Sequence, residues 1–396
     1  MWTAAQDQAL LEISRWFKNE AKHNPIFRLF GYAGTGKTTL ARHIAETLGV
    51  KASFAAFSGK AAHVLSQKGC PAKTIHSLIY RPIKRSSKYL AELKDKIEQE
   101  TNKEEKEKLT KKLLDASKKH RAPLFEFSPN ECLDDVKLLI IDECSMVGER
   151  MGKDLVSLGI PILVLGDPGQ LPPIGDAGFF TNQKPNILLT EIHRQARDNP
   201  IIHLATLART GQSITTGDYG SGVVVKSRKE IDAKEVLSMD QILVGKNETR
   251  RLWNGRIRQL KFNTQNPLPI VGEKLICLRN SKSGLLNGSI WEILSEPIYF
   301  DDNSDLLIAD ITSPDAAHSD VQMYTKIFKN QEISFYERYE TVEEFDYGYA
   351  ITVHKSQGSQ WDKVMLLNES GSFRKMQNNW LYTGITRAAE ELTILL

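Results

Sequence analysis

A glycine-rich run near the N-terminus carries the clearest chemical signal in the chain. Residues 31–38 read Gly-Tyr-Ala-Gly-Thr-Gly-Lys-Thr, which fits G-x-x-x-x-G-K-[ST] between a predicted strand and a predicted helix. Such glycines let backbone amides approach phosphate oxygens, and Lys37 neutralises the outer phosphates. The run therefore predicts a site for ATP with Mg²⁺ on the Thr38 hydroxyl. Its nucleotide-binding residues are Gly34, Thr35, Gly36, Lys37, Thr38 and Thr39.

Two neighbouring acids supply the second half of this site. The apolar run 138–141 predicts a strand buried on both faces, and Asp142 and Glu143 follow it directly. Asp142 can hold Mg²⁺ at the end of the strand, and Glu143 can orient the attacking water. Such acids taken alone are as often solvated turn residues. Their pairing with the phosphate loop favours the catalytic interpretation.

Gln6 has two interpretations that the sequence leaves open. Thr3 and Gln6 have the spacing of a capping box, in which the glutamine side chain satisfies the start of a helix. A glutamine upstream of a phosphate loop can also contact adenine. One side chain could do both.

These residues need an α/β framework to bring them together. The first half alternates short apolar runs with helical patterns, which is typical of a parallel sheet covered by helices. Strands are expected at 27–30, 52–57, 138–141 and 162–165, and helices at 38–48 and 60–67. We place this first domain at residues 1–183. A second α/β domain is expected over 184–396, with a strand at 241–244.

Two insertions interrupt these domains. Residues 84–121 hold 13 Lys/Arg and 8 Asp/Glu with apolar residues at helical spacing, which predicts a charged helical hairpin. Its flanks, 78–83 and 124–128, are expected to pair as short strands, so the insertion spans 80–128. Between about 268 and 346, Gly, Asn, Asp and Ser punctuate short β segments. This pattern predicts a small β-barrel inserted in the second domain.

Composition sets the broad class. The chain has 396 residues, 41% apolar and 26% charged, which excludes a disordered, collagen-like or disulfide-stapled protein. Four cysteines without a C-x-x-C pair favour a reducing compartment and argue against zinc or iron–sulfur sites. No apolar run approaches the ~18 residues of a membrane span, and no signal peptide is recognisable at the N-terminus. We therefore expect a cytoplasmic protein.

Six further motifs follow in order along the chain. They are Ala-Phe-Ser-Gly-Lys-Ala-Ala at 56–62, Thr-Ile-His-Ser-Leu at 74–78, Leu-Gly-Asp-Pro-Gly-Gln-Leu-Pro-Pro-Ile at 165–174, Leu-Thr-Glu-Ile-His-Arg-Gln at 189–195, Val-His-Lys-Ser-Gln-Gly at 353–358 and Leu-Tyr-Thr-Gly-Ile-Thr-Arg-Ala at 381–388. With the two nucleotide motifs, their order and spacing resemble superfamily 1 helicases of the 5′-to-3′ RecD-like branch. The resemblance is closest to phage Dda-like helicases. It covers the chain from residue 2 to the C-terminus, apart from the two insertions.

The resemblance implies two RecA-like P-loop NTPase domains with ATP in the cleft between them. Gln170 would then sense the γ-phosphate from the first domain, and Gln357 and Gly358 would border the nucleotide from the second. Arg194 and Arg387 would act as arginine fingers. The catalytic set is Lys37, Glu143, Gln170, Arg194 and Arg387. An arginine supplied across a cleft couples hydrolysis to closure, because only the closed state is fully complemented.

The remaining motif residues imply two sets of single-stranded DNA contacts. The first domain would offer Ser58, Lys60, His76, Ser77 and Pro172, and the second Thr352, His354, Lys355 and Ser356. Hydroxyls, imidazoles and lysines suit phosphate and sugar contacts that do not read sequence. Each alone could instead be a helix cap or a core histidine. Phe57 stands where the family often has proline, and it could stack on a base or belong to the core.

We therefore expect a 5′-to-3′ single-stranded DNA translocase and helicase acting on tailed duplexes in replication, repair or recombination. It would be a monomer in a bacterial or phage-infected bacterial cell. An ATP-gated nucleic-acid-binding or recruitment subunit without unwinding activity, or an RNA helicase, are the alternatives. The charged hairpin could crown a duplex-splitting wedge, dock a replication or recombination protein, or be a solvated spacer.

The net charge of +3 does not oppose nucleic-acid binding. The hairpin at 84–121 contributes +5, from 13 basic and 8 acidic residues, whereas 332–346 holds six acids and one arginine. The near-neutral total therefore reflects opposing local patches.

Overall fold

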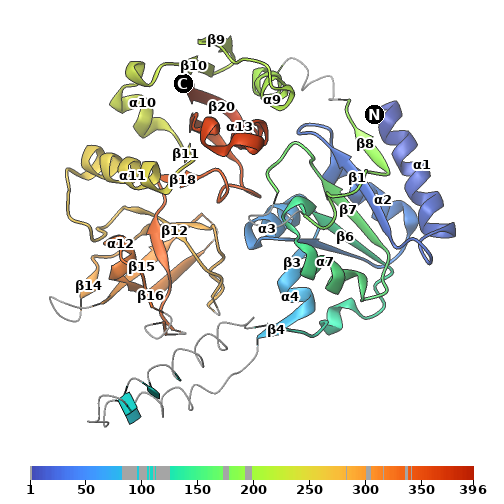
Figure 1. The fold of residues 1–396 in the computed structure, drawn as a ribbon, viewed down its shortest axis with the longest axis horizontal. Coiled ribbons are helices and arrows are strands. Elements are labelled where there is room, and N and C mark those ends of the chain that lie inside the picture. Colours follow the sequence, from blue (N-terminus) through green and yellow to red (C-terminus); the bar gives the residue numbers. More distant parts are fainter. Residues whose placement is uncertain are drawn as a thin grey trace.

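The computed structural model describes residues 2–82, 96–97, 105–106, 108–109, 112, 125–172, 178–191, 199–281, 283–299, 305–314, 316–334, 338–339 and 341–396. They form three units, two with mixed α/β layers and one built mainly of strands (Figure 1). The charged hairpin expected at 84–121 lies almost entirely outside the described residues.

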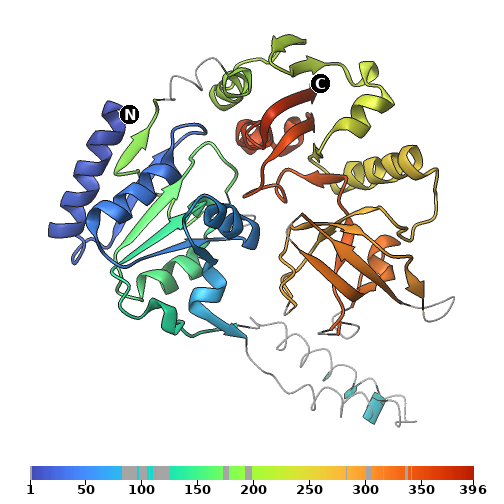
Figure 2. The ribbon, with the colours of Figure 1, turned by 180° about the vertical axis from the view of Figure 1, so that it is seen from behind.

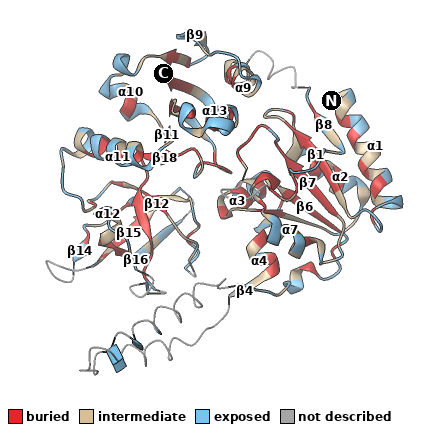
Figure 3. Ribbon diagram, in the orientation of Figure 1, coloured by how far each residue is buried: buried red, intermediate tan, exposed pale blue. Residues whose placement is uncertain are grey.

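The first unit is a parallel sheet of six strands in the order β3-β2-β6-β7-β1-β8. The strands are β1 (Ile26–Gly31), β2 (Ala52–Ala56), β3 (Ala72–Thr74), β6 (Leu138–Asp142), β7 (Ile162–Gly166) and β8 (Ile187–Leu189). Their central members are near-continuous apolar runs because both faces of the sheet are covered, and Figure 3 shows them buried. Since β8 pairs with β1, this sheet extends past residue 183, the predicted end of the first domain.

Helices cover both faces of the first sheet. They are α1 (Ala4–Asn19), α2 (Lys37–Leu48), α3 (Gly59–Gln67), α4 (Ile75–Ile79) and α7 (Glu149–Val156). Alternate residues of β6 and β7 pack against α1 and α2 on one face and against α4 and α7 on the other. Figure 2 shows α1 and α2 lying across the sheet. This arrangement leaves the carboxyl ends of the strands open for a site.

The second unit is a sheet in the order β18-β11-β19-β20-β10-β9, parallel except for the terminal β9–β10 pair. Its strands are β9 (Gly217–Gly220), β10 (Val223–Lys226), β11 (Gln241–Val244), β18 (Ala350–Thr352), β19 (Trp361–Leu367) and β20 (Ala388–Leu395). The accompanying helices are α9 (Pro200–Thr210), α10 (Ala233–Ser238), α11 (Asn247–Phe262) and α13 (Gln377–Ile385). The expected strand at 241–244 is β11.

The third unit is antiparallel and lies between β11 and β18 in the sequence. It contains β12 (Lys274–Cys277), β13 (Ile290–Ile293), β14 (Ile298–Tyr299), β15 (Leu306–Thr312), β16 (Ala317–Tyr324), the short helix α12 (Thr325–Phe328) and β17 (Phe345–Tyr347). The strand order is β14-β15-β13-β12-β17, with β16 beside β15. An isolated parallel bridge pairs Met323 of β16 with Glu343, two residues before β17, and so links the two sides of this sheet. Closure into the expected barrel stays a prediction.

The flanks of the charged hairpin pair as predicted. β4 (Tyr80–Pro82) and β5 (Phe125–Phe127) form a two-stranded antiparallel ladder in which Tyr80 lies opposite Phe127. The ladder leaves the lower edge of the first unit in Figure 1. No helix in the described ranges is both long and apolar enough to cross a membrane.

Candidate active site

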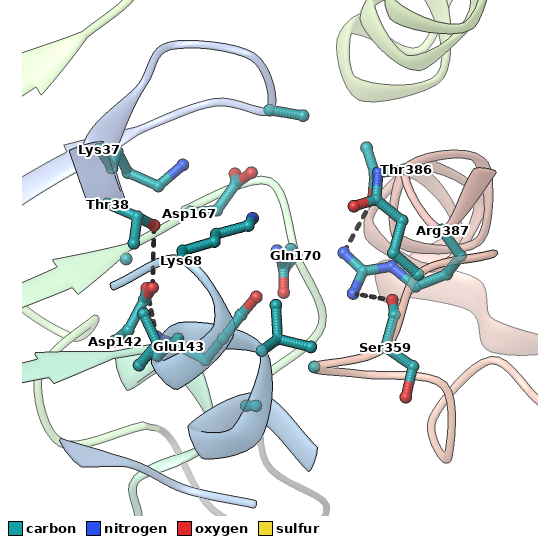
Figure 4. A pocket seen from close by; sticks show the side chains of 17 residues that line it. Lys37, Thr38, Lys68, Asp142, Glu143, Asp167, Gln170, Ser359, Thr386 and Arg387 are labelled. Atoms are coloured by element: carbon teal, nitrogen blue, oxygen red, sulfur yellow. Dashed lines mark hydrogen bonds between the residues drawn. The ribbon is translucent and has the colours of Figure 1, made fainter. Parts of the chain in front are cut away.

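A cavity of about 190 Å³ lies where the first and second units meet. Figure 4 shows residues of both units around it. The first unit contributes the phosphate loop, the carboxyl ends of β6 and β7, and one face of α3. The second contributes residues 358–360 and the end of α13 with Thr386 and Arg387. The cavity therefore has walls that belong to separate sheets.

The phosphate loop owes its shape to its glycines. Gly34 and Gly36 have φ values of +78° and +72°, a region that residues with a Cβ rarely adopt, and α2 begins directly after Gly36. A Cβ on Gly31 would lie 2.6 Å from Thr35 Oγ1. Lys37 Nζ donates to the carbonyl oxygens of Gly31 at 2.7 Å and Tyr32 at 3.1 Å. The loop thus holds the Lys37 ammonium group at its opening.

Thr38 and Asp142 form the part of the site that fits a metal ion. Thr38 Oγ1 donates to Asp142 Oδ2 at 3.0 Å, which joins α2 to the end of β6. Mg²⁺ takes oxygen ligands and is usually held by one or two carboxylates together with substrate phosphates. Across the described ranges, no group of three or more His, Cys, Asp or Glu side chains is arranged to hold a metal. A hydroxyl beside one carboxylate is the donor set that Mg²⁺ with a nucleotide requires.

Glu143 follows Asp142 in a strained backbone conformation. Its φ is +52°, and its backbone N–H donates to Asp142 Oδ1 at 2.8 Å. Burial raises the pKa of the Glu143 carboxyl, and the positive charge of Arg387 opposes that rise. Residues held at unfavourable backbone angles are concentrated at functional sites. Glu143 has the position of a group that orients water over the phosphate loop.

Arg387 reaches the cavity from the second unit and is 6% exposed. Its guanidinium donates to the Thr383 carbonyl, the Ser359 carbonyl and Thr386 Oγ1, each at 3.1 Å. Figure 4 shows Arg387 across the cavity from Lys37, Asp142 and Glu143. These three hydrogen bonds to the second unit fix the orientation of the Arg387 guanidinium.

Gln170 lies between these groups. It is 9% exposed, and its Oε1 is buried without a hydrogen-bond partner in the described part of the chain. A buried amide oxygen of this kind is costly unless a ligand or water satisfies it. Gln170 therefore has the location expected of a residue that contacts the nucleotide. Arg194 lies outside the described residues.

Only some of the predicted nucleotide-site residues are among the cavity lining given by the described residues. Lys37, Thr38, Asp142, Glu143, Gln170, Gly358 and Arg387 line it. Its lining does not include Gln6, Gly34, Thr35, Gly36, Thr39 or Gln357. The Thr35 hydroxyl donates to the Tyr32 carbonyl at 2.8 Å, and Gln357 Nε2 donates to the Leu171 carbonyl at 2.8 Å. In this structure Thr35 supports the loop and Gln357 joins the two units.

Gln6 forms the capping box. Thr3 and Gln6 exchange side-chain and backbone bonds at the start of α1, and Gln6 is 2% exposed. Its Nε2 also donates to the Thr35 carbonyl at 3.1 Å, which ties α1 to the phosphate loop. The capping interpretation is confirmed. An adenine contact by the same side chain stays a prediction.

Sequence reasoning missed several residues that line the cavity. Asp167, Ser359, Gln360 and Thr386 belong to or adjoin motifs already recognised, but they were assigned no role. Lys68 lies at the end of α3, and the spacing of Ala61, Leu65 and Lys68 places them on one helix face. Helical periodicity was the one signal that could have identified Lys68.

The first set of predicted DNA-binding residues surrounds α3 and α4. Ser58 Oγ accepts from Ala61 N–H at 3.2 Å and so caps α3. Lys60 Nζ lies 4.6 Å from the centroid of the Trp361 ring, and burial lowers its pKa to about 8. Pro172 is half-buried beside the loop that carries Gln170. The first two residues lie at the junction between the units.

His76 and Ser77 lie at the base of the β4–β5 ladder. The His76 ring contacts the rings of Phe57 and Tyr80, with centroid distances of 5.9 and 5.5 Å. Burial lowers the pKa of His76. The Ser77 hydroxyl donates to the Thr74 carbonyl at 2.8 Å. Phe57 packs partly against the core and partly against His76, so this aromatic group is internally supported.

The second set lies in the turn that follows β18. Thr352 Oγ1 accepts from Lys355 N–H at 3.4 Å, and the His354 ring packs 5.4 Å from the Phe373 ring. Burial lowers the pKa values of His354 and Lys355. Ser356 has no exposed surface, and its hydroxyl donates to the Val353 carbonyl at 2.8 Å. The Ser356 hydroxyl closes the turn in this structure, and its expected contact with a DNA strand stays a prediction.

Two family models match the chain. One describes an AAA domain and covers residues 18–226, and the other describes a UvrD-like helicase C-terminal domain and covers residues 347–395. The chain is 26% identical over 398 residues to the ATP-dependent RecD2 DNA helicase of Deinococcus radiodurans, an alignment that covers 91% of this chain. It spans 46% of the length of that relative.

Solved structures share the fold. A structure of two coordinating Pif1 helicases at forked double-stranded DNA gives a TM-score of 0.57 at 18% identity, covering 100% of this chain and 92% of that chain. Bacteroides Pif1 bound to single-stranded DNA gives 0.53 at 18% identity with the same coverage. The α/β fold class with two RecA-like domains is therefore confirmed. The details of the two insertions, and the closer likeness to Dda-like helicases, stay predictions.

Proposed function

The chain belongs to the AAA domain family and is related to the RecD-like and Pif1-like helicases of superfamily 1, and from this premise we propose that it is an ATP-dependent single-stranded DNA translocase and helicase. One observation carries the proposal. Lys37, Glu143 and Arg387 line a single cavity, although Arg387 comes from a different sheet. A nucleotide in this cavity would bring the two units together, because the charges that complement it lie on both sides.

Each residue of the cavity has a chemical role in this proposal. Lys37 and Arg387 stabilise the charge on the phosphoryl group that is transferred, and Arg194 adds a second cation from the second domain. Glu143 orients the attacking water, and Gln170 contacts the γ-phosphate. Thr38 and Asp142 would hold Mg²⁺, which supplies further neutralisation of the phosphate oxygens. Hydrolysis removes the shared ligand and lets the units separate.

The grip on DNA alternates between the two units. Ser58, Lys60, His76, Ser77 and Pro172 contact the strand from the first, and Thr352, His354 and Lys355 from the second. Closure and opening of the cavity change the distance between these sets and so move the strand. Two relatives support DNA as the substrate, since one is named a DNA helicase and another was solved with single-stranded DNA. The 5′-to-3′ direction follows the RecD-like branch.

The proposal also covers the substrate, oligomeric state and cellular location of the protein. The protein acts on tailed duplexes as a monomer in the cytoplasm of a bacterial or phage-infected bacterial cell, in replication, repair or recombination. The bacterial RecD2 relative supports that setting. The arm at 84–121 would carry contacts to duplex DNA or to a replication or recombination protein.

The direct test measures ATP hydrolysis with and without single-stranded DNA, followed by strand displacement on 5′-tailed and 3′-tailed duplexes. Lys37→Ala and Glu143→Gln are expected to abolish DNA-stimulated hydrolysis. Lys153→Ala is the control, because Lys153 is an exposed lysine on α7 that pairs with Glu149 on its own helix. Normal unwinding by either site variant would overturn the mechanism.

A second candidate is an ATP-gated binding or recruitment subunit. The presence of both Glu143 and Arg387 at the cavity opposes it, since a switch that only binds nucleotide needs neither. Hydrolysis without strand displacement on either tailed duplex would favour this candidate. Repeating the assay on tailed RNA distinguishes an RNA helicase.

A further inference from the structure

Tyr382 forms a hydrogen-bonded link between three segments that are distant in sequence. It lies on α13 of the second unit and is 2% exposed. Its hydroxyl accepts from the backbone N–H of Ala33, in the phosphate loop, at 2.8 Å. The same hydroxyl donates to Asp167 Oδ2 at 2.6 Å. One oxygen atom thus connects the phosphate loop, the end of β7 and α13.

Both oxygens of the Asp167 carboxylate accept hydrogen bonds in this arrangement. Asp167 is 3% exposed, and its other oxygen accepts from Gly169 N–H at 2.9 Å, which fixes the loop that leads to Gln170. Burial first, and the charge of Asp167 second, raise the pKa of the Tyr382 hydroxyl well above its usual range. The hydroxyl therefore stays protonated and donates. A hydrogen bond to a buried carboxylate is stronger than one between neutral groups.

The backbone around Tyr382 is fitted to the same contact. A Cβ added to Gly169 would lie 2.8 Å from Tyr382 Cε1, so the close approach of the ring requires glycine there. Asn379 Nδ2 donates to the carbonyls of Gly169 and Gln170 at 3.0 and 3.2 Å. Thr383 Oγ1 accepts from Leu171 N–H at 3.0 Å. One face of α13 therefore holds the 167–171 loop over its whole length.

The 167–171 loop and the segment that follows α13 both carry residues of the proposed hydrolysis site. The 167–171 loop presents Gln170 to the cavity, and the chain reaches Arg387 two residues after α13 ends at Ile385. A shift of the phosphate loop at Ala33 would act on Tyr382, and through α13 on Arg387. No nucleotide contact by Tyr382 is needed for this effect, since Tyr382 does not line the cavity.

We propose that Tyr382 is a positioning residue that couples the phosphate loop to Arg387 and Gln170 through its bonds to Ala33 and Asp167. The inference rests on the proposed ATPase function and adds a residue to it. It predicts that loss of the hydroxyl leaves nucleotide binding intact and impairs the alignment of the groups that act during hydrolysis.

Tyr382→Phe tests the link, because it removes one oxygen atom and keeps the ring. We expect kcat of DNA-stimulated ATP hydrolysis to fall roughly tenfold, the rate equivalent of one hydrogen bond to a charged group, with KM for ATP changed by less than about twofold. Tyr347→Phe is the matched control. Its buried hydroxyl donates to the Pro267 carbonyl at 2.7 Å in the third unit, away from the cavity, so kcat should be unchanged.

A double-mutant cycle distinguishes coupling from general destabilisation. Asp167→Asn breaks the same link from the first unit, so Tyr382→Phe should add little to it, and the double variant should be about as slow as the slower single variant. Multiplied effects on kcat would overturn the proposal. Thermal melting of each variant shows how much stability has changed.

The remaining outcomes are also decisive. An unchanged kcat in Tyr382→Phe, or a raised KM with normal kcat, overturns the inference and leaves the proposed function intact. If Tyr382→Phe does not fold, Asp167→Asn alone must separate kcat from KM, and an unchanged kcat there counts against the link. Failure of the wild-type protein to hydrolyse ATP contradicts the proposed function instead.

Discussion

The ammonium group of Lys60 lies 4.6 Å from the centroid of the Trp361 ring. Lys60 is on α3 of the first unit and Trp361 begins β19 of the second, so this cation–π contact bridges the two α/β units. It lies beside another close approach, because a Cβ on Gly358 would be 3.0 Å from Ser58 Oγ. The start of α3 and the 358–361 segment therefore meet where DNA-binding residues were predicted from both units.

Lys60 should make DNA binding sensitive to mild alkali. Burial lowers its pKa to about 8, so the ammonium loses its proton as the pH rises through that value. We expect affinity for single-stranded DNA to fall between pH 7 and 9, because a neutral amine no longer attracts phosphate. Fluorescence anisotropy with a labelled oligonucleotide measures the change.

Lys60→Arg provides the control for this pH effect. Arginine stays charged over the same range, so the variant should bind with a flatter pH dependence. Lys274, whose pKa is also lowered to about 8, remains in both proteins and cancels in the comparison. If DNA affinity changed equally with pH in the wild type and in Lys60→Arg, Lys60 would not set the pH dependence.

Gly358→Ala should impair ATP hydrolysis by crowding the junction. Gly358 has a φ of +73°, and an added Cβ would meet Ser58 Oγ and the Ala61 Cβ at 3.0 and 3.1 Å. Gly284→Ala is a matched control, since its φ is +93° and no atom of the described residues lies within 4 Å of the added Cβ. Both variants should lose about 1–2 kcal/mol of stability from backbone strain. Only Gly358→Ala should lower kcat, and equal kcat values would show that the junction tolerates the extra carbon.

Arg387→Ala should nearly eliminate catalysis. The guanidinium is held by three oxygen atoms around the end of α13, and loss of an arginine finger reduces kcat by about 10³-fold or more. Arg387→Lys should recover little, because lysine lacks the fork that makes these bonds. Arg228→Ala, which removes an exposed arginine bonded to the Asn368 carbonyl, should retain full activity. Steady-state ATPase assays on the three variants test whether Arg387 is catalytic. Appreciable turnover by Arg387→Ala would remove Arg387 from the catalytic set.

Arg258→Met should destabilise the protein. Arg258 Nε donates to Glu273 Oε1 at 2.5 Å, with side-chain exposures of 5% and 0%. Removing the arginine leaves a buried carboxylate without its partner, which costs about 3–5 kcal/mol. Arg256→Met, at an exposed position on the same helix, should change stability little. Chemical denaturation compares the two variants, and similar midpoints would show that Glu273 is satisfied by its other contacts.

Local patterns in the sequence were sufficient for much of the fold. The phosphate loop, the buried strands and the flanks of the charged hairpin were predicted because each depends on neighbouring residues and on turn chemistry. The edge of the first sheet was misplaced, since β8 is only three residues long and is recognised as part of that sheet by its pairing with β1. The burial of Ser356 could not be predicted for a similar reason, because it depends on what packs over the turn.

The sequence by itself determined the chemistry available to this protein. Lys37, Thr38, Asp142 and Glu143 have the spacing of a nucleotide site on any parallel sheet that carries them, since strand ends and helix starts are local features. Only the tertiary structure decided which residues of the second unit meet them. It placed Arg387 across the cavity, Trp361 beside Lys60, and Tyr382 between Ala33 and Asp167. These contacts join positions more than 200 residues apart, and they depend on how two separately built sheets dock.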